Sequence, residues 1–254
     1  MEGRRDQRER LRSERQAAES GAAATLARKR RLQYLILAAF AAVAVIVALI
    51  VISQSGGDEG GTASSLSGEA QVNSELLGIP QNGQALGEAN APITITEFGD
   101  PQCPTCAAFA EQIAPQLIAA EVQTGNGKLV FEPYLIIGPD SEPAMTAALA
   151  AGEQGRFWNY LQLFYANQGA ENSGYVTDDF LTSIAGAAGV PDIDTWNRSR
   201  DDSKWNAVLA RGTNEAQTFG FNGTPSIVVA GPKGERALSG FTLGEIEAAI
   251  QQVG

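Results

Sequence analysis

Nineteen consecutive residues of this 254-residue chain, from Tyr34 to Ile52, carry no charged side chain. As an α-helix, this run of mainly Ala, Val, Ile and Leu would be roughly 30 Å long, which matches the hydrocarbon core of a bilayer. Four basic residues at positions 28–31 precede it closely, and Ser-Gln-Ser-Gly-Gly follows it. Because positive charge is retained on the cytoplasmic side, the N-terminus is expected in the cytoplasm and the rest outside. We therefore predict a transmembrane signal anchor over residues 33–52.

A cleaved signal peptide is the main alternative for this segment. Its apolar region would have about 7–15 residues and would end at a small-residue cleavage site. The run here is longer, no such site follows it, and no cysteine follows it that could be acylated. A buried core helix is a second alternative, and the basic cluster on its N-terminal side argues against it.

The charges of the chain divide at the same place. Residues 1–32 hold ten Lys and Arg against five Asp and Glu, whereas the remainder holds eight against twenty-four. We interpret residues 1–32 as a basic cytoplasmic segment that sets the topology, although anionic lipid or nucleic acid would also attract it. No nucleic-acid partner is expected.

Residues 53–86 are poor in aromatic residues and rich in Gly, Ser, Gln and Asn, which predicts a flexible linker about 30 Å long.

The counts of histidine and cysteine exclude several kinds of site. The chain has no His and two Cys. A Ser-His-Asp triad and a Cys-His pair are therefore impossible, and two sulfurs cannot complete a four-ligand structural zinc site. Two cysteines are also too few for a scaffold held by several disulfides. We expect no metal site, and the position of the two cysteines becomes the main clue to function.

Residues 87–254 show the alternation of an α/β domain. Strands are predicted where β-branched residues cluster, and helices where apolar residues recur every three to four positions. The predicted strands are residues 93–98, 129–137, 226–230 and 236–238, and the predicted helices are 103–122, 144–151, 157–166, 178–188, 194–219 and 243–253. A β-α-β unit implies two parallel strands, and the last two strands form an antiparallel hairpin. We expect one mixed sheet covered by helices, with a helical insertion at about 141–215.

The two cysteines form the motif Cys103-Pro104-Thr105-Cys106, between the first predicted strand and the first predicted helix. With Cys103 at the N-cap, Pro104 occupies the first helical position, where its missing N–H is not needed. The helix N-terminus and the N–H groups of Thr105 and Cys106 favour a thiolate on Cys103. Cys106, one turn further, is expected to be more buried. An exposed nucleophilic sulfur beside a recessed one is the arrangement that thiol–disulfide exchange requires.

Other interpretations of the motif are weaker. A disulfide across so short a loop stabilises little through chain entropy, so a purely structural role is disfavoured. Two ordinary buried cysteines seldom stand at a strand–helix junction with a proline between them. Metal binding would need ligands from a second chain. An extracytoplasmic location would also allow a disulfide to persist.

From about residue 87 to its end, the chain resembles the DsbA family of extracytoplasmic thioredoxin-fold proteins in its membrane-anchored bacterial form. The matching segments are residues 91–92, 97–98, 102–106, 141–144, 155–158 and 220–225. The resemblance implies an α/β thioredoxin-like fold with an inserted helical domain, preceded here by one transmembrane helix. It implies thiol–disulfide exchange on exported proteins, with Cys103 and Cys106 as catalytic residues and no bound cofactor.

Three further residues gain roles from the resemblance. Thr224-Pro225 matches the family's cis-proline loop, where Thr224 would pair with an extended substrate peptide. Sequence alone leaves an ordinary trans proline equally open. Glu97 shares the strand face of Ile93 and Ile95, which predicts a buried carboxyl group with a raised pKa. It matches the family's buried acid, which relays a proton for the resolving cysteine, whereas a solvent-exposed strand glutamate is the alternative.

The sequence departs from the family's strong oxidases between the cysteines. Those proteins carry Pro-His, and the His helps to hold the thiolate, whereas Pro104 is followed here by Thr105. Thr105 can donate one hydrogen bond and brings no positive charge. A less stabilised thiolate makes the protein a weaker oxidant. Pro104 and Thr105 are thus expected to modulate the active site, and the direction of electron flow stays open.

The leading hypothesis is a monomeric, anchored oxidase that introduces disulfides into reduced exported proteins. A quinone-linked membrane protein of the DsbB or VKOR type would reoxidise its cysteine pair. A reductase or isomerase supplied with electrons by a transmembrane carrier is the first alternative. A tethered peptide-binding domain without redox turnover is the second.

Overall fold

The computed structural model describes residue 3 and residues 66–238 and 240–254. The predicted cytoplasmic segment, the predicted anchor at 33–52 and the first part of the predicted linker lie outside these residues. Within the described part of the chain, no helix combines the length and the apolar character that crossing a bilayer requires.

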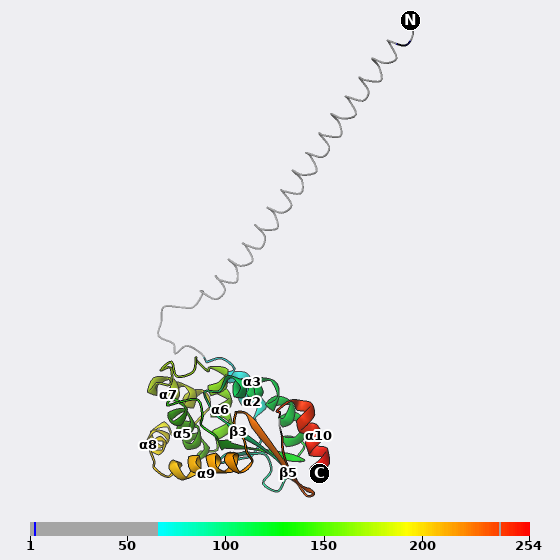
Figure 1. The fold of residues 1–254 in the computed structure, drawn as a ribbon. Coiled ribbons are helices and arrows are strands. Elements are labelled where there is room, and N and C mark those ends of the chain that lie inside the picture. Colours follow the sequence, from blue (N-terminus) through cyan, green and yellow to red (C-terminus); the bar gives the residue numbers. More distant parts are fainter. Residues whose placement is uncertain (1–2, 4–65, 239) are drawn as a thin grey trace. The chain divides into compact units, whose positions relative to one another are not determined.

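A mixed sheet of six strands forms the centre of the folded unit (Figure 1). The strands are β1 (Gln81–Asn82), β2 (Ala85–Leu86), β3 (Ile93–Gly99), β4 (Gly127–Pro133), β5 (Ser226–Gly231) and β6 (Gly234–Ala237), in the order β1-β2-β4-β3-β5-β6. β3 and β4 run parallel, and the other neighbours are antiparallel. The predicted β-α-β unit and the predicted C-terminal hairpin are therefore confirmed.

Helices surround this sheet and fill the long connection between β4 and β5. They are α2 (Glu69–Glu75), α3 (Pro104–Gln112), α4 (Ala114–Leu117), the π-helical turn η1 (Ile118–Val122), α5 (Ser141–Gly152), α6 (Phe157–Ala166), α7 (Asp178–Ala187), α8 (Ile193–Arg200), α9 (Trp205–Thr218) and α10 (Leu243–Val253). Helices α5 to α9 form the predicted helical insertion, which ends at residue 218 rather than at about 215.

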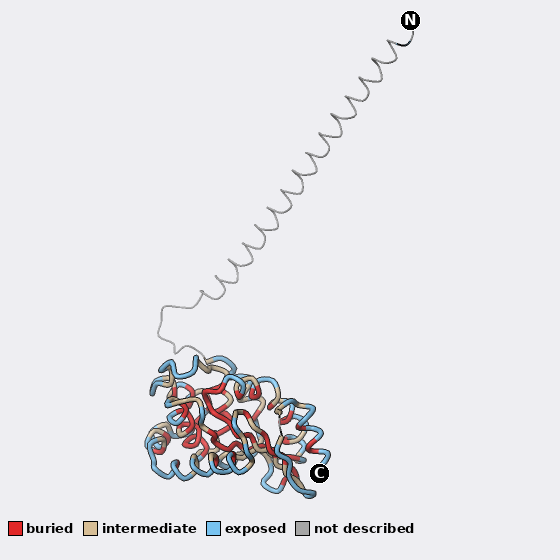
Figure 2. The backbone as a smooth tube through the Cα atoms, in the orientation of Figure 1, coloured by how far each residue is buried: buried red, intermediate tan, exposed pale blue. Residues whose placement is uncertain are grey.

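Two apolar cores lie on the two faces of the sheet. The larger core includes Ile93 and Ile95 of β3, Phe109 of α3 and Ile246 of α10. The smaller core, on the opposite face, joins Phe98 to Ala216 of α9, together with Tyr134 and Val228. Figure 2 shows the buried backbone concentrated in the middle of the folded unit. Period-2 alternation along β3 thus places Glu97 on the same face as the larger core.

Two predicted helices are each divided in the structure. The predicted helix 103–122 breaks at Ile113, because Pro115 has no N–H to donate to a continuous helix. The predicted helix 194–219 separates into α8 and α9 around residues 201–204. There the Asp202 carboxylate accepts a hydrogen bond from the Lys204 backbone N–H, a local alternative to helical hydrogen bonding.

The second strand also differs from its prediction. It ends at Pro133 rather than at Ile137. The N–H groups of Ile136 and Ile137 donate to the Asp100 carboxylate instead of to a neighbouring strand, at 2.8 and 2.9 Å. The Asp100 side chain, which lies outside the strand, therefore takes the N–H groups that would continue strand pairing beyond Pro133.

The predicted linker at 53–86 is wrong for residues 66–86. These residues form α2 and the β1–β2 hairpin, so the folded unit begins well before residue 87. Leu76 is only 3% exposed, and Ser67 and Asn167 exchange two hydrogen bonds of 2.9 and 3.0 Å. The average composition of the segment is polar, but a few apolar residues at helical spacing are enough to dock it on the larger core.

Candidate active site

The two cysteines lie at the edge of the sheet where β3 and β4 end and β5 begins. Cys103 is the N-cap of α3 with backbone angles φ −74° and ψ 119°, and Pro104 opens the helix. The predicted cap arrangement is therefore present. Its Pro fits because the first turn of a helix leaves N–H groups without intrahelical acceptors.

Residues from two loops meet at the Cys103 sulfur. Cys103 Sγ lies 2.9 Å from Thr105 Oγ1 and 3.3 Å from the carbonyl oxygen of Thr224. Thr105 Oγ1 also lies 3.0 Å from that carbonyl oxygen. The Thr224–Pro225 peptide bond is cis, as the family resemblance implies. Cys103, Thr105 and Thr224 therefore form one polar cluster, although Thr224 is 121 residues from Cys103 in sequence.

Cys103 is less accessible than the sequence predicted. Its exposed fraction is 3%, whereas we expected an exposed nucleophile. Thr105 and the Thr224 backbone lie against its sulfur and cover it. Hydrogen bonding from the Cys106 thiol, and then from Thr105 and the Cys106 backbone, outweighs burial and lowers the pKa of Cys103 to about 5. The expected thiolate is thus favoured, in a more enclosed position.

Cys106 occupies the recessed position that the sequence predicted. Its exposed fraction is 0%, and both cysteines are free thiols in this structure. Burial, followed by its hydrogen bond to Cys103 and the charge of Glu97, raises the pKa of the Cys106 thiol. The pKa values of the two thiols are therefore shifted in opposite directions, although the residues are one helical turn apart.

Glu97 is buried, as the strand pattern predicted. Its exposed fraction is 4%, and its Oε1 has no hydrogen-bond partner within the described chain. Burial, and then the charge of Cys103, raises the pKa of Glu97 to about 8. The charge of Glu97 in turn contributes to the raised pKa of Cys106.

The sequence indicated no role for Asp100, and it placed Gln102 only within a segment that matches the family. Both side chains are fully buried. The Asp100 carboxylate accepts a 2.9 Å hydrogen bond from the Gln102 N–H in addition to those from Ile136 and Ile137. The available signal was the Gly-Asp-Pro turn itself, since Asp commonly accepts hydrogen bonds from N–H groups two residues further on.

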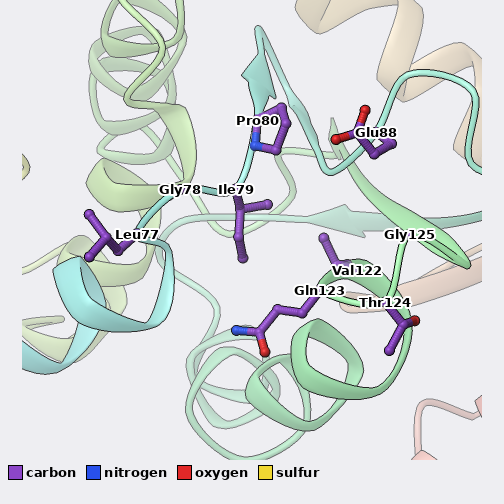
Figure 3. Close-up of a pocket in the computed structure, with 9 residues that line it drawn as sticks. All are labelled: Leu77, Gly78, Ile79, Pro80, Glu88, Val122, Gln123, Thr124 and Gly125. Carbon is purple, nitrogen blue, oxygen red and sulfur yellow. The ribbon is translucent and has the colours of Figure 1, made fainter.

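The cavity drawn in Figure 3 lies away from these residues. It has a volume of about 380 Å³, and its lining includes Leu77, Glu88 and residues 122–125. Residues 122–125 lead into β4, whose Gly127 pairs with Ile93 at the start of β3, whereas Cys103 follows the end of β3. No residue with redox chemistry lines it. In the part of the chain described here, no three Asp, Glu or Cys side chains are arranged to hold a metal ion.

Comparison with known proteins shows the family of this chain. A family model described as thioredoxin matches residues 81–250. The probable disulfide bond formation protein D of Bacillus cereus is 29% identical over 152 residues, which cover 58% of this chain and 70% of that protein.

Solved structures show the same fold. Oxidised BdbD from Bacillus subtilis superposes with a TM-score of 0.59 at 23% identity, covering 68% of this chain and 97% of that one. A thioredoxin-like oxidoreductase from Silicibacter pomeroyi gives a TM-score of 0.55 at 28% identity, with 71% and 95% covered. The chain therefore belongs to the thioredoxin family, among its DsbA-like thiol:disulfide oxidoreductases.

Proposed function

We propose that this protein oxidises cysteine pairs of exported proteins by exchange with a Cys103–Cys106 disulfide. The observation that carries the proposal is the contrast between the two sulfurs. Cys103 has its pKa lowered to about 5 at the helix N-terminus, whereas Cys106 is fully buried with a raised pKa. A low-pKa thiolate is a good leaving group, which favours transfer of the disulfide to a substrate.

The proposed reaction has two exchange steps. A substrate thiolate attacks Cys103 Sγ, so the Cys103–Cys106 bond breaks and a substrate–Cys103 disulfide forms. The electron pair passes to Cys106, which takes a proton because its pKa is high. A second substrate thiolate then attacks the substrate sulfur of the mixed disulfide, and Cys103 leaves as a thiolate. The substrate is oxidised by two electrons, and the protein gains them as a thiol and a thiolate.

Glu97 is suited to supply the proton for Cys106. With its pKa near 8, it is protonated at neutral pH and can give up that proton without leaving the physiological range. The contribution of its charge to the raised pKa of Cys106 supports this role. Glu97 is therefore the proposed proton donor during opening of the disulfide and the proposed acceptor during its closure.

Thr224 and Pro225 are the proposed substrate-binding residues. The Thr224 carbonyl lies within 3.3 Å of the Cys103 sulfur, so a peptide paired with it would have its own cysteine at the reacting bond. Thr105 also approaches this carbonyl, at 3.0 Å, and competes with a peptide N–H for it. Pro104 and Thr105 are the proposed modulators of the site.

A membrane anchor and a membrane partner complete the proposal. The apolar run at 33–52 and its basic flank support a single transmembrane helix with the folded unit outside the cytoplasm. Net oxidation of substrates needs an electron acceptor, and the proposed one is a quinone-linked membrane protein of the DsbB or VKOR type. The proposed working unit is the monomer.

Trapping of mixed disulfides tests this function. In Cys106→Ser the Cys103 thiolate can attack a disulfide of an exported protein, which breaks that disulfide and forms a mixed disulfide, but no Cys106 sulfur is present to release Cys103. Exported proteins should therefore accumulate as covalent adducts at Cys103 that are released by dithiothreitol. Cys103→Ser is the matched control and should trap none. Equal, dithiothreitol-resistant capture by both variants would instead identify a peptide-binding domain without redox turnover. A redox titration in glutathione separates the remaining alternative, because a potential as negative as that of thioredoxin would identify a reductase.

A further inference from the structure

The loop that carries Cys103 is held by the end of one helix of the insertion. Tyr165 Oη donates a 3.2 Å hydrogen bond to the Asp100 carbonyl, and the Asn172 N–H donates a 2.7 Å bond to the Gln102 side chain. Between them, Gln168 reaches the two remaining residues of the loop, Pro101 and Cys103. Helices α3 and α6 pack against each other here (Figure 1).

Gln168 uses both hydrogens of its side-chain amide for this contact. Nε2 lies 2.7 Å from the Pro101 carbonyl oxygen and 3.2 Å from the Cys103 carbonyl oxygen. Two carbonyl oxygens accept only, so the amide must present its nitrogen to them rather than its oxygen. The Cys103 carbonyl also accepts the 3.1 Å bond from the Ala107 N–H that begins α3.

These two bonds act on the backbone before and after the reacting sulfur. Pro101 O belongs to the peptide group before Gln102, and Cys103 O belongs to the peptide group that joins Cys103 to Pro104. With both carbonyls fixed, the Cα–Cβ bond of Cys103 points in a fixed direction too. The sulfur then stays beside Thr105 and the Thr224 carbonyl, at the N-terminus of α3.

The end of α6 is held by other contacts and does not depend on Gln168. Tyr165 is buried, and Asn167 exchanges two hydrogen bonds with Ser67 and donates a third to Leu163. Ser67 precedes α2 and lies outside the residues 81–250 that the family model matches. Loss of the Gln168 amide should therefore leave α6 in place and release only the Cys103 loop.

We infer that Gln168 is a positioning residue for thiol–disulfide exchange, which holds the backbone on both sides of Cys103 so that its sulfur remains at the α3 N-terminus. The inference rests on the proposed function, because it assigns Gln168 a part in setting the redox equilibrium. The helix N-terminus favours a thiolate, which exists only in the reduced protein. Precise placement of Cys103 therefore stabilises the reduced form more than the disulfide form.

Gln168→Met tests the inference, because Met has a similar length and no hydrogen to donate. In a glutathione titration, the equilibrium should move toward the disulfide form by roughly two- to tenfold, the effect of one or two hydrogen bonds. The Cys103 thiolate absorbance should also appear at higher pH than in the parent protein. Gln162→Met is the matched control, since Gln162 lies on α6, shortly before Gln168, and makes no hydrogen bond to the Cys103 loop; it should change neither value.

Stabilities of the two redox forms distinguish positioning from a general structural effect. Urea unfolding of the reduced and disulfide forms of Gln168→Met should show a larger loss in the reduced form. Equal losses with an unchanged equilibrium constant would overturn the inference. If Gln168→Met does not fold, Gln168→Leu, which also lacks the two donors and adds no charge near the Cys103 thiolate, should shift the equilibrium in the same direction. A parent protein that never equilibrates with glutathione would refute the proposed function itself.

Discussion

Thr105 holds the Cys103 sulfur with a single hydroxyl hydrogen, for which two acceptors compete. When Cys103 is a thiol, Thr105 can donate to the Thr224 carbonyl, 3.0 Å away. When Cys103 is a thiolate, the same hydrogen is needed at the sulfur, 2.9 Å away. The position between the cysteines therefore stabilises the thiolate without a positive charge, and less strongly than a protonated histidine would.

Replacement of Thr105 by Val should weaken the acidity of Cys103. Val keeps the shape and removes the hydroxyl, so the acid dissociation constant should fall roughly tenfold, about the effect of one hydrogen bond to a charged group. Thiolate absorbance near 240 nm, followed against pH in the reduced protein, measures the change. Thr105→Ser keeps the hydroxyl and should titrate close to the parent. A Val variant that titrates like the parent would show that Thr105 does not contribute to the acidity of Cys103.

Replacement of Glu97 by Gln should stabilise the reduced protein at neutral pH. Folded Glu97 remains protonated up to about pH 8, whereas the unfolded carboxyl group ionises near 4.5. Stability contributed by this group is therefore complete below pH 4.5 and is lost as the pH rises toward 8. At pH 7 the Gln variant should gain roughly 2–3 kcal/mol in free energy of unfolding, and at pH 4 almost nothing.

Urea unfolding at the two pH values measures this difference. Glu111→Gln, an exposed change on α3, is the control and should show no comparable gain. A gain for Glu97→Gln that is the same at pH 4 and pH 7 would contradict a raised pKa. The same variant should slow exchange at Cys106, because the proposed proton donor is absent.

Sequence alone predicted where the proposed reacting residues lie in the fold, but not their surroundings. Cys103 at the cap, buried Cys106 and inward Glu97 followed from local patterns, namely a proline after the cap, helical spacing and strand alternation. The burial of Cys103 did not follow, because it depends on Thr224, 121 residues away. The proposed role of Gln168 could not be predicted for the same reason, since a hydrogen bond between distant loops leaves no periodic signal in the sequence.

At the level of secondary structure, the least predictable part was the segment before residue 87. Its Gly and Asn content predicted a linker, yet it contains α2 and two strands. Neighbouring leucines show why composition misled: Leu76 is 3% exposed, whereas Leu77 is 82% exposed. Leu76, the C-cap of α2, and the partly buried Val72 are enough to dock the segment, and a compositional average cannot detect so few contacts.

These two leucines form a matched pair for testing that α2 belongs to the folded unit. Leu76→Ala should lower the free energy of unfolding by roughly 2–4 kcal/mol, as expected for a buried leucine. Leu77→Ala should change it by less than about 0.5 kcal/mol. Urea unfolding of residues 63–254 gives both values. Equal, small effects would show that α2 does not pack on the folded unit in solution.

For the whole molecule, the acidic body and the basic N-terminal segment support different environments on the two sides of the apolar run. The full chain should float with lipid vesicles in a density gradient and stay with them in high salt, because burial of an apolar helix is insensitive to ionic strength. Residues 53–254 should remain in solution. Release of the full chain by salt would show electrostatic adsorption and contradict the anchor.

From β3 onward, the order of strands and helices was predictable from local sequence patterns, whereas α2, β1 and β2 were not expected. The β-α-β unit, the helical insertion and the final hairpin all agree with their predictions. The helix breaks and the end of β4 were not predictable to the residue, because Asp100 and other side chains compete with regular backbone pairing.

Alkylation of the reduced protein across pH tests the central claim most directly. Iodoacetamide should label Cys103, the pH dependence of the labelling rate should have its midpoint near 5, and Cys106 should stay unlabelled in the folded protein. Peptide mass spectrometry identifies the modified residue. A midpoint near that of an ordinary thiol, or comparable labelling of Cys106, would contradict the account.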